Sequence, residues 1–383
     1  MSTPSMATLA GRLLVTPGAP LPNSLGSSRQ DWASRVGAGQ PVATLPGLLA
    51  SLFNLCGNAH RACAQLAIGA ADATEAGQSA PDDISERLRL ETAQEHIRRI
   101  GLDWPRLLTR GADHTACAQA AADTLACCPA LRPPGQALWP ALHDWLQHHW
   151  LQMDPATWLS AWCAGAGDWL HAWAQRHSGW LPSLLREAQQ ADMPNHPLNS
   201  RRALTVHGAS ASLRRLSDAL SGTPGFVQQP DWQGTVAHSG AWARLQTPAE
   251  QPALSPWAML GSRIAELVRL CLPGAAPDHG ALWLRWGALH VQPGTGLGWV
   301  EMARGLLVHQ VTLNDGGRSA QSCRVLAPTE WNFHPQGEVA QRLSALDPAS
   351  PGLRQQVAVL MAAFDPCVPY ELAPNPAQEA DHA

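Results

Sequence analysis

The sequence predicts a mostly helical α+β fold with a smaller antiparallel β portion. Apolar residues recur at three- and four-residue steps between residues 44 and 70, which is the period of one helix face. Tryptophan pairs four residues apart, at 158 and 162 and at 169 and 173, indicate further helix faces with large apolar area. After Pro273 short β-type runs follow, and Asn314-Asp315-Gly316-Gly317 is a strong hairpin signal because Asn and Gly accept positive φ.

Composition narrows the class of protein. The 383 residues suffice for one large domain or two modest ones, and 32 Pro with 32 Gly predict many turns. A net charge of −4 without a long basic run does not support a nucleic-acid partner. No stretch approaches about 18 consecutive apolar residues, so we expect no membrane span, and the first residues do not resemble a secretion signal. Nine scattered Cys, an odd number without paired spacing, indicate reduced thiols in a cytoplasm.

The helical part is expected to follow an early strand at residues 7–16 and an irregular Pro-, Gly- and Ser-rich connection. Helices are predicted at about 44–70, 84–100, 211–220 and 257–272, with a short helix carrying Cys117, Cys127 and Cys128. Eight Trp between residues 139 and 180 are expected mainly to pack in the core, with a partner surface as the alternative.

The β portion is predicted to contain strands at 281–286, 306–313 and 322–326. The glycine-rich run Gly294-Thr295-Gly296-Leu297-Gly298 lacks the setting of a phosphate loop, so we predict a turn there. A last helix at about 353–364 then delivers Asp365-Pro366-Cys367. We expect one domain, with an N-terminal strand and irregular segment (1–40), a helical part (41–275), a β-rich part (276–335) and a C-terminal helix and tail (336–383).

Cys56, His60 and Cys63 share the buried face of the first long helix. Two thiols and an imidazole could form three corners of a metal site. Free Cys more often packs as a small hydrophobe, so the spacing alone leaves both readings open.

Three stretches together resemble the large subunit of NiFe hydrogenases, over most of the chain. Residues 54–63, Asn-Leu-Cys-Gly-Asn-Ala-His-Arg-Ala-Cys, are similar to that family's R-x-C-G-x-C-x-x-x-H motif. Residues 298–307 and then Pro328-Thr329-Glu330-Trp331-Asn332 resemble its E-A-P-R-G-x-L and P-[ST]-x-W-N segments. Residues 364–370, Phe-Asp-Pro-Cys-Val-Pro-Tyr, are similar to its D-P-C-x-x-C-x-x-H motif.

The departures from that pattern concern the metal ligands. In the family each C-x-x-C pair supplies one terminal nickel thiolate and one thiolate that bridges nickel and iron. Here the first Cys of each pair remains, as Cys56 and Cys367, while Ala59 and Tyr370 replace the second. Asn54 and Cys63 stand where the family has Arg and His. We therefore expect neither nickel nor hydrogenase catalysis.

The remaining half-site suggests the assembly scaffolds of the HoxV/HupK type, which resemble the large subunit and serve its formation. The resemblance implies a transiently held Fe(CN)2(CO) unit on Cys56 and Cys367, with Cys63 as a third ligand or transfer thiol. It also implies that Arg304, Pro328 and Thr329 form the pocket for the cyanide and carbonyl ligands. A cation and a hydroxyl suit cyanide nitrogens through charge-assisted hydrogen bonds. His60 would tune Cys56 without binding iron, or simply pack in the core.

The implied partners are the iron-loading maturation proteins, a small HypC-type chaperone and a HypD-type protein, and the apo large subunit as acceptor. We expect no enzyme activity, no nucleic-acid partner and a cytoplasmic location. Three alternatives stay open: a metal-free interaction chaperone, a structural zinc site built from Cys56, His60, Cys63 and Cys367, and a hydrogen sensor, which the missing bridging thiolates disfavour.

Overall fold

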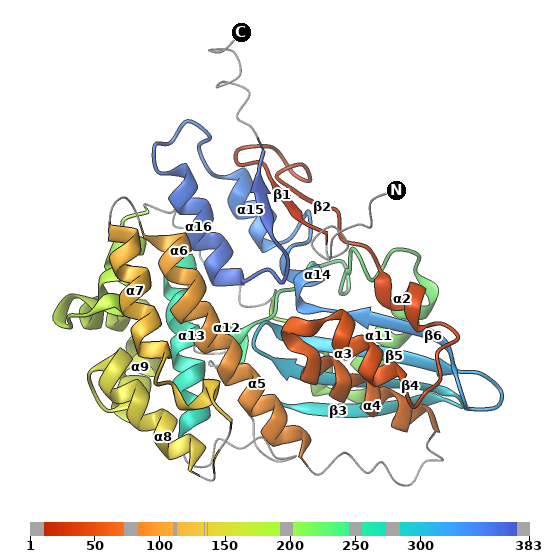
Figure 1. The fold of residues 1–383 in the computed structure, drawn as a ribbon. Helices are drawn as coiled ribbons and strands as arrows, with labels where there is room; N and C mark the ends of the chain where they lie inside the picture. Colours follow the sequence, from red (N-terminus) through yellow and green to blue (C-terminus); the bar gives the residue numbers. More distant parts are fainter. Residues whose placement is uncertain are drawn as a thin grey trace, which may run out of the picture.

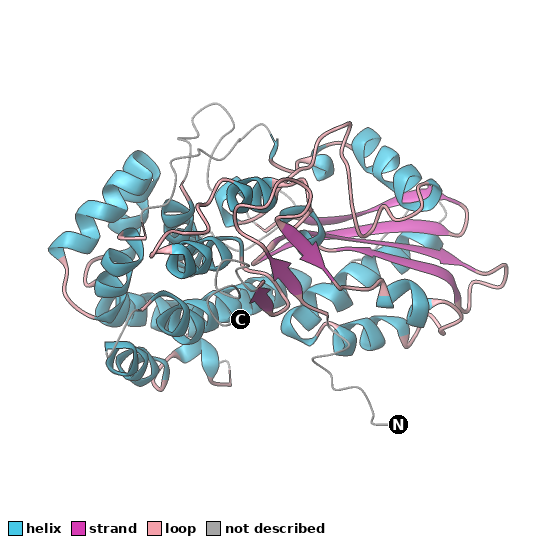
Figure 2. Cartoon of the chain, turned by 90° about the horizontal axis from the view of Figure 1, so that it is seen from above, coloured by secondary structure: helices cyan, strands magenta, loops and turns pink. Residues whose placement is uncertain are grey.

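A computed structural model describes residues 11–72, 83–109, 113–133, 135, 137–191, 202–244, 255–272 and 284–373. A bundle of helices occupies one side of the molecule, and a four-stranded sheet with helices on its faces occupies the other (Figure 1). Seen from above, the strands extend away from the bundle (Figure 2). The predicted mostly helical α+β class with an antiparallel portion is confirmed.

The bundle is built around α13 (Pro256–Cys271), which is buried along almost its whole length. It contacts α9 (Pro155–Arg176), α16 (Leu353–Phe364) and α5 (Ile84–Arg98). The other helices of this side are α6 (Trp104–Leu108), α7 (Asp113–Leu125), α8 (Leu138–Trp145), α10 (Trp180–Gln189) and α12 (Ala241–Arg244). A π-helical turn, Arg99–Asp103, joins α5 to α6. Four Trp side chains of the Trp-rich segment are almost fully buried here, which supports core packing: Trp150, Trp158, Trp162 and Trp173.

The four-stranded sheet is antiparallel throughout. Its strands lie in sequence order: β3 (Trp286–Gln292), β4 (Thr295–Met302), β5 (Gly305–Leu313) and β6 (Ala320–Leu326). Because side chains alternate along a strand, Val300 and Leu307 pack with α4 (Gly57–Asp72), while Leu297 and Val308 pack on the opposite face with α11 (Ser210–Gly222).

The glycine-rich run is a strand, so the predicted turn over 294–298 is wrong beyond Gly294. Gly296 and Gly298 lie in β4 on the face covered by α4. A Cβ at Gly298 would lie 2.3 Å from the Cys63 carbonyl oxygen, and one at Gly296 would lie 2.2 Å from that of Ala67. Glycine is needed there because the helix backbone approaches the strand so closely.

A second, three-stranded sheet joins the two ends of the described chain. Its order is β2 (Leu25–Ser27), β1 (Leu13–Val15), β7 (Tyr370–Leu372), with β1 and β7 parallel. The pairing starts three residues after Cys367 and therefore fixes the tail that carries this thiol. The short helices α2 (Trp32–Gly37), α14 (Pro328–Asn332) and α15 (Glu338–Ser344) complete the region.

Several boundaries differ from the predictions. The helix predicted over 44–70 is two helices, α3 (Leu45–Leu52) and α4, separated by Phe53 and the 3₁₀ turn Asn54–Cys56. The strand predicted at 281–286 begins only at Trp286, and residues 281–283 lie outside the described part, as do 7–10 of the early strand. Cys127 and Cys128 follow α7 and are not part of it. Among the described residues, no helix is long and apolar enough to cross a membrane.

Candidate functional site

A cavity of about 230 Å³ lies where five segments distant in sequence meet. Its walls come from residues 29–32, from the end of α3 to the start of α4 (52–60), from the β4–β5 turn, from the start of α14 and from the tail after α16. Six of the seven side chains that the sequence singled out line it: Cys56, His60, Arg304, Pro328, Thr329 and Cys367. The cavity is therefore our candidate site.

Cys56 lies at the end of the 3₁₀ turn, where the chain leaves α3 and starts α4. Its backbone N–H donates to the Phe53 carbonyl, and its side chain is 6% exposed. Burial raises the pKa of the Cys56 thiol well above its usual value and Glu95 adds to this, while Arg304 opposes it. Cys56 is therefore a protonated, buried thiol.

Cys367 follows α16 after Asp365, whose φ of 54° turns the chain out of the helix, and Pro366. Two donors reach its sulfur: Arg29 Nη1 at 3.1 Å and Thr329 Oγ1 at 3.1 Å. Arg29 also forms an ion pair with Glu330, with Nη2 2.7 Å from Oε1. Burial alone would lower the pKa of Arg29, but Cys367 and Glu330 raise it, so the guanidinium stays charged. Cys367 Sγ is therefore held between a charged guanidinium and a hydroxyl group.

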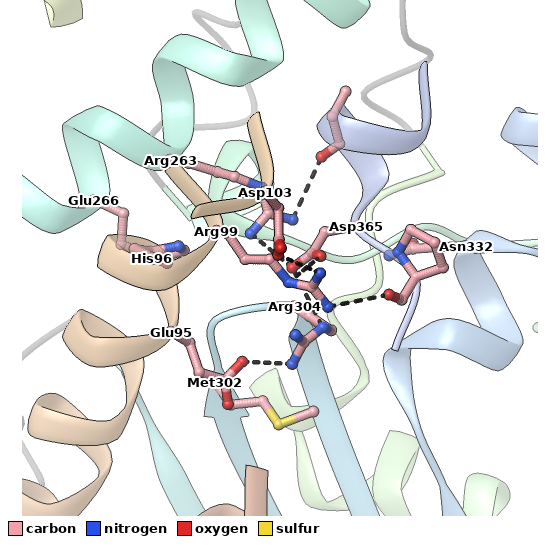
Figure 3. Close-up of polar contacts among 12 residues, drawn as sticks. Glu95, His96, Arg99, Asp103, Arg263, Glu266, Met302, Arg304, Asn332 and Asp365 are labelled. Carbon is pink, nitrogen blue, oxygen red and sulfur yellow. Dashed lines mark hydrogen bonds and ion pairs between the residues drawn. The ribbon is translucent and has the colours of Figure 1, made fainter. Parts of the chain in front are cut away.

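Arg304 stands in the tight turn between β4 and β5 and is 2% exposed. Its guanidinium pairs with Glu95 of α5, and its Nε lies 3.2 Å from Asp365 Oδ2 (Figure 3). Asp365 in turn pairs with Arg99 at 2.8 Å and Arg263 at 3.2 Å. Burial alone would lower the pKa of Arg304, but Asp365 and Glu95 raise it. Arg304 is thus held rigidly as a cation beside both thiols.

His60 stacks on Phe53, with ring centroids 4.1 Å apart, and its Nδ1 lies 3.0 Å from His309 Nε2. Burial and then His309 lower its pKa well below the usual value, so the imidazole is neutral. His60 lines the cavity, and one of its two ring nitrogens, Nδ1, is engaged with another histidine of the core.

Cys63 does not line the cavity. Its thiol donates to the carbonyl oxygens of Gly298 (3.1 Å) and Leu307 (3.7 Å), so it faces the sheet. Within the described ranges, no three His, Cys, Asp or Glu side chains gather where they could hold a metal ion. The thiols that the structure brings to the cavity are Cys56 and Cys367, and the imidazole of His60 lies beside them.

Arg29, Glu95 and the ion-pairing role of Asp365 were not predicted. Asp365 lies within one of the three motif-like stretches, and Glu95 lies in the helix predicted at about 84–100, to which no role in the site was given. No sequence signal marks Arg29, because its position beside Cys367 depends on packing between chain segments 338 residues apart.

The molecule has the fold of NiFe-hydrogenase large subunits. It matches the NAD+-reducing [NiFe]-hydrogenase in its H2-reduced state with a TM-score of 0.51, 15% identity and coverage of 90% of this chain and 91% of that one. It matches the Ni-Fe-Se hydrogenase of Desulfovibrio vulgaris Hildenborough with a TM-score of 0.52, 11% identity and coverage of 89% and 92%. At such identities the likeness establishes the fold alone.

Two relatives of similar length indicate the protein family. The hydrogenase expression/formation protein HoxV of Cupriavidus necator is 39% identical over 94% of this chain and 95% of its own length. The hydrogenase expression/formation protein HupK of Bradyrhizobium diazoefficiens is 32% identical over 91% of each. No model of a known protein family matches. The chain belongs to the HoxV/HupK family of hydrogenase expression/formation proteins.

Proposed function

We propose that this protein is a non-catalytic scaffold of hydrogenase maturation that holds an Fe(CN)2(CO) unit on Cys56 and Cys367. It receives this cargo from the iron-loading HypC-type and HypD-type proteins and passes it to the apo large subunit, in the cytoplasm and without nickel. The observation that carries the proposal is that two thiols distant in sequence line one cavity together with Arg304, Pro328 and Thr329. The family's role in hydrogenase formation supports the same conclusion.

Charge and softness of the donors support an iron cargo. Thiolates suit a soft, low-spin iron, and Fe(II) with two cyanides and two thiolates carries a charge of −2. The partly buried Arg29 contacts the Cys367 sulfur directly, and the buried Arg304 lines the same cavity, so two guanidinium groups stand beside the anion. Pro328 adds an apolar wall, which suits a carbonyl ligand that accepts no strong hydrogen bond.

Release follows from the missing bridging thiolates. In the large subunit the two thiolates that bind iron also bridge to nickel, whereas Cys56 and Cys367 have no second metal to share, so transfer proceeds toward the four-Cys acceptor. Structural zinc would require four ligands. Against this alternative, Cys63 donates to strand carbonyls and His60 Nδ1 lies against His309, which favours the two-thiol site over a four-ligand one.

Infrared spectroscopy of anaerobically purified protein tests the proposal. We expect cyanide and carbonyl stretching bands together with about one iron per chain and no stoichiometric nickel or zinc. Cys56→Ala and Cys367→Ala should each abolish the bands, because one thiol alone cannot hold the unit. Cys63→Ala should retain them, since this thiol contacts the sheet; it is the matched control because it is also a buried Cys, two turns further along the chain in α4.

Protein that lacks both bands and iron when the iron-loading proteins are present would refute the cargo. The same protein binding the large subunit would then be an interaction chaperone.

A further inference from the structure

A second hollow of about 540 Å³, here called the α5–α6 groove, opens beside the candidate site. It is formed by the end of α5, the π-helical turn, α6, the end of α16 and the tail up to Tyr370. The groove and the site cavity share Leu55, Arg304, Cys367 and Val368. Cys367 therefore lies on the wall between them, whereas Cys56 lines only the inner cavity.

Two large apolar side chains are exposed at the rim of this groove. Leu55 is 51% exposed and Leu102 is 39% exposed; among the described residues only two other large apolar side chains, Leu14 and Leu21, are classed as exposed. Leu102 projects from the π-helical turn, a type of irregularity often found at functional sites. An exposed pair of leucines beside a hollow marks a surface that gains free energy when another chain covers it.

The unpaired charges at the rim of the groove are positive. Its three carboxylates are each paired with an arginine: Glu95 with Arg304, Asp103 with Arg99, and Asp365 with Arg99, Arg263 and Arg304. Arg98 and Arg106 are exposed and form no ion pair or hydrogen bond with any described residue. The uncompensated charge at the rim is therefore positive, which attracts an acidic partner.

We propose that the α5–α6 groove is the docking site for the partner that supplies the cargo, and that it binds a segment presenting an apolar side chain between Asp or Glu residues. The inference rests on the proposed function. The order of the two thiols indicates the supplier, because an arriving iron meets Cys367 at the groove before it reaches Cys56 behind it. The two leucines cover the apolar side chain, and Arg98 and Arg106 pair with its acidic neighbours.

The test measures the affinity of the full-length protein for a purified complex of the HypC-type and HypD-type proteins, by anaerobic titration calorimetry. Leu102→Asp and the double variant Arg98→Glu/Arg106→Glu should each weaken binding about tenfold or more. Leu21→Asp and Arg215→Glu are the matched controls, since they change a similarly exposed leucine and an exposed arginine outside the groove, and should bind as the wild type does. Affinity of the wild type should fall with salt, and that of the double variant should fall less steeply.

Unchanged affinity in both groove variants, or equal weakening in the controls, overturns the inference. Thermal unfolding of each variant shows that the comparison concerns folded protein. If the wild type carries the infrared bands while the groove variants bind normally, docking is wrong and the cargo proposal stands. If the groove variants bind more weakly but the wild type never shows the infrared bands, docking is supported and the cargo is refuted. Weakening confined to the apo large subunit, or to self-association, also overturns the choice of partner.

Discussion

Arg29 acts on the candidate site through a single sulfur. Its guanidinium donates to Cys367 Sγ and is held in place by Glu330, and both of these side chains are mostly buried. A donor to a thiolate withdraws electron density from sulfur, and thus from any metal that the sulfur binds. The two thiols of the cavity are therefore different: Cys367 has two hydrogen-bond donors, and Cys56 lies beside the carboxylate Glu95.

The contact between Arg29 and Cys367 predicts how Arg29→Gln changes the infrared spectrum of the proposed iron cargo. The carbonyl stretching band should move to lower wavenumber, because a more electron-rich sulfur increases back-donation from iron into the carbonyl ligand. Infrared spectra of the variant and the wild type at equal iron content measure the shift. Arg35→Gln, an exposed arginine six residues further on, should leave the band in place. A band that stays in place or rises in Arg29→Gln would show that this residue does not act on the sulfur.

The contact between α4 and β4 positions the first thiol. Gly296 and Gly298 let the helix lie against the strand at the distance of backbone contact, and Cys63 then reaches the strand carbonyls. Cys56 directly precedes α4 and His60 lies in its first turn, so the distance of α4 from the sheet sets where both side chains enter the cavity.

We expect Gly298→Ala to destabilise the protein by about 1–3 kcal/mol, since the added Cβ collides with helix backbone that cannot rotate away. Urea unfolding monitored by circular dichroism gives this free energy. Gly316→Ala in the β5–β6 hairpin is the matched control: nothing lies within 4 Å of its Cβ position, and the change should stay within about 0.5 kcal/mol. Equal stability of the two variants would contradict the close approach.

A buried ionic cluster joins α5, α12 and α13 of the helical bundle. Glu266 of α13 accepts from Arg244 of α12 (2.7 Å) and pairs with His96 of α5 (2.7 Å) (Figure 3 shows His96 and Glu266). Burial alone would raise the pKa of Glu266, but Arg244 and His96 hold it at about 2, below its ordinary value of 4.5. The carboxylate thus stabilises the fold above pH 4.5, and this contribution is lost as the pH falls through 2.

Glu266→Gln should therefore lower the free energy of unfolding at pH 7 by about 3–5 kcal/mol, because Arg244 loses its buried partner. The variant should also lose less stability than the wild type between pH 4.5 and 2. Denaturant unfolding across this pH range measures both effects. Glu371→Gln, whose ion pair with Arg12 is more than half exposed, serves as the control and should change little. Parallel pH profiles for Glu266→Gln and the wild type would exclude a charged Glu266.

Much of the fold followed from local pattern. The helices α11, α13 and α16 and the strands β5 and β6 were predicted to within a few residues, because a 3.6-residue or two-residue apolar period reflects which face is buried. The glycine-rich strand β4 was wrongly predicted as a turn. Its glycines are required by the close approach of α4, and nothing in the neighbouring sequence indicates that contact. The break at Phe53 was missed because apolar residues continue through it.

The sequence by itself determined the class of the protein and the candidate residues, because its motifs keep the order and spacing of the hydrogenase large subunit while losing two thiols. Only the tertiary structure decided which of those residues share a cavity, for that depends on how β1 pairs with β7 and how α4 lies on the sheet. It brought Cys56 and Cys367 together, turned Cys63 to the strand carbonyls and set Arg29 on the second sulfur. Side-chain direction is a long-range property, since it is fixed by partners hundreds of residues away.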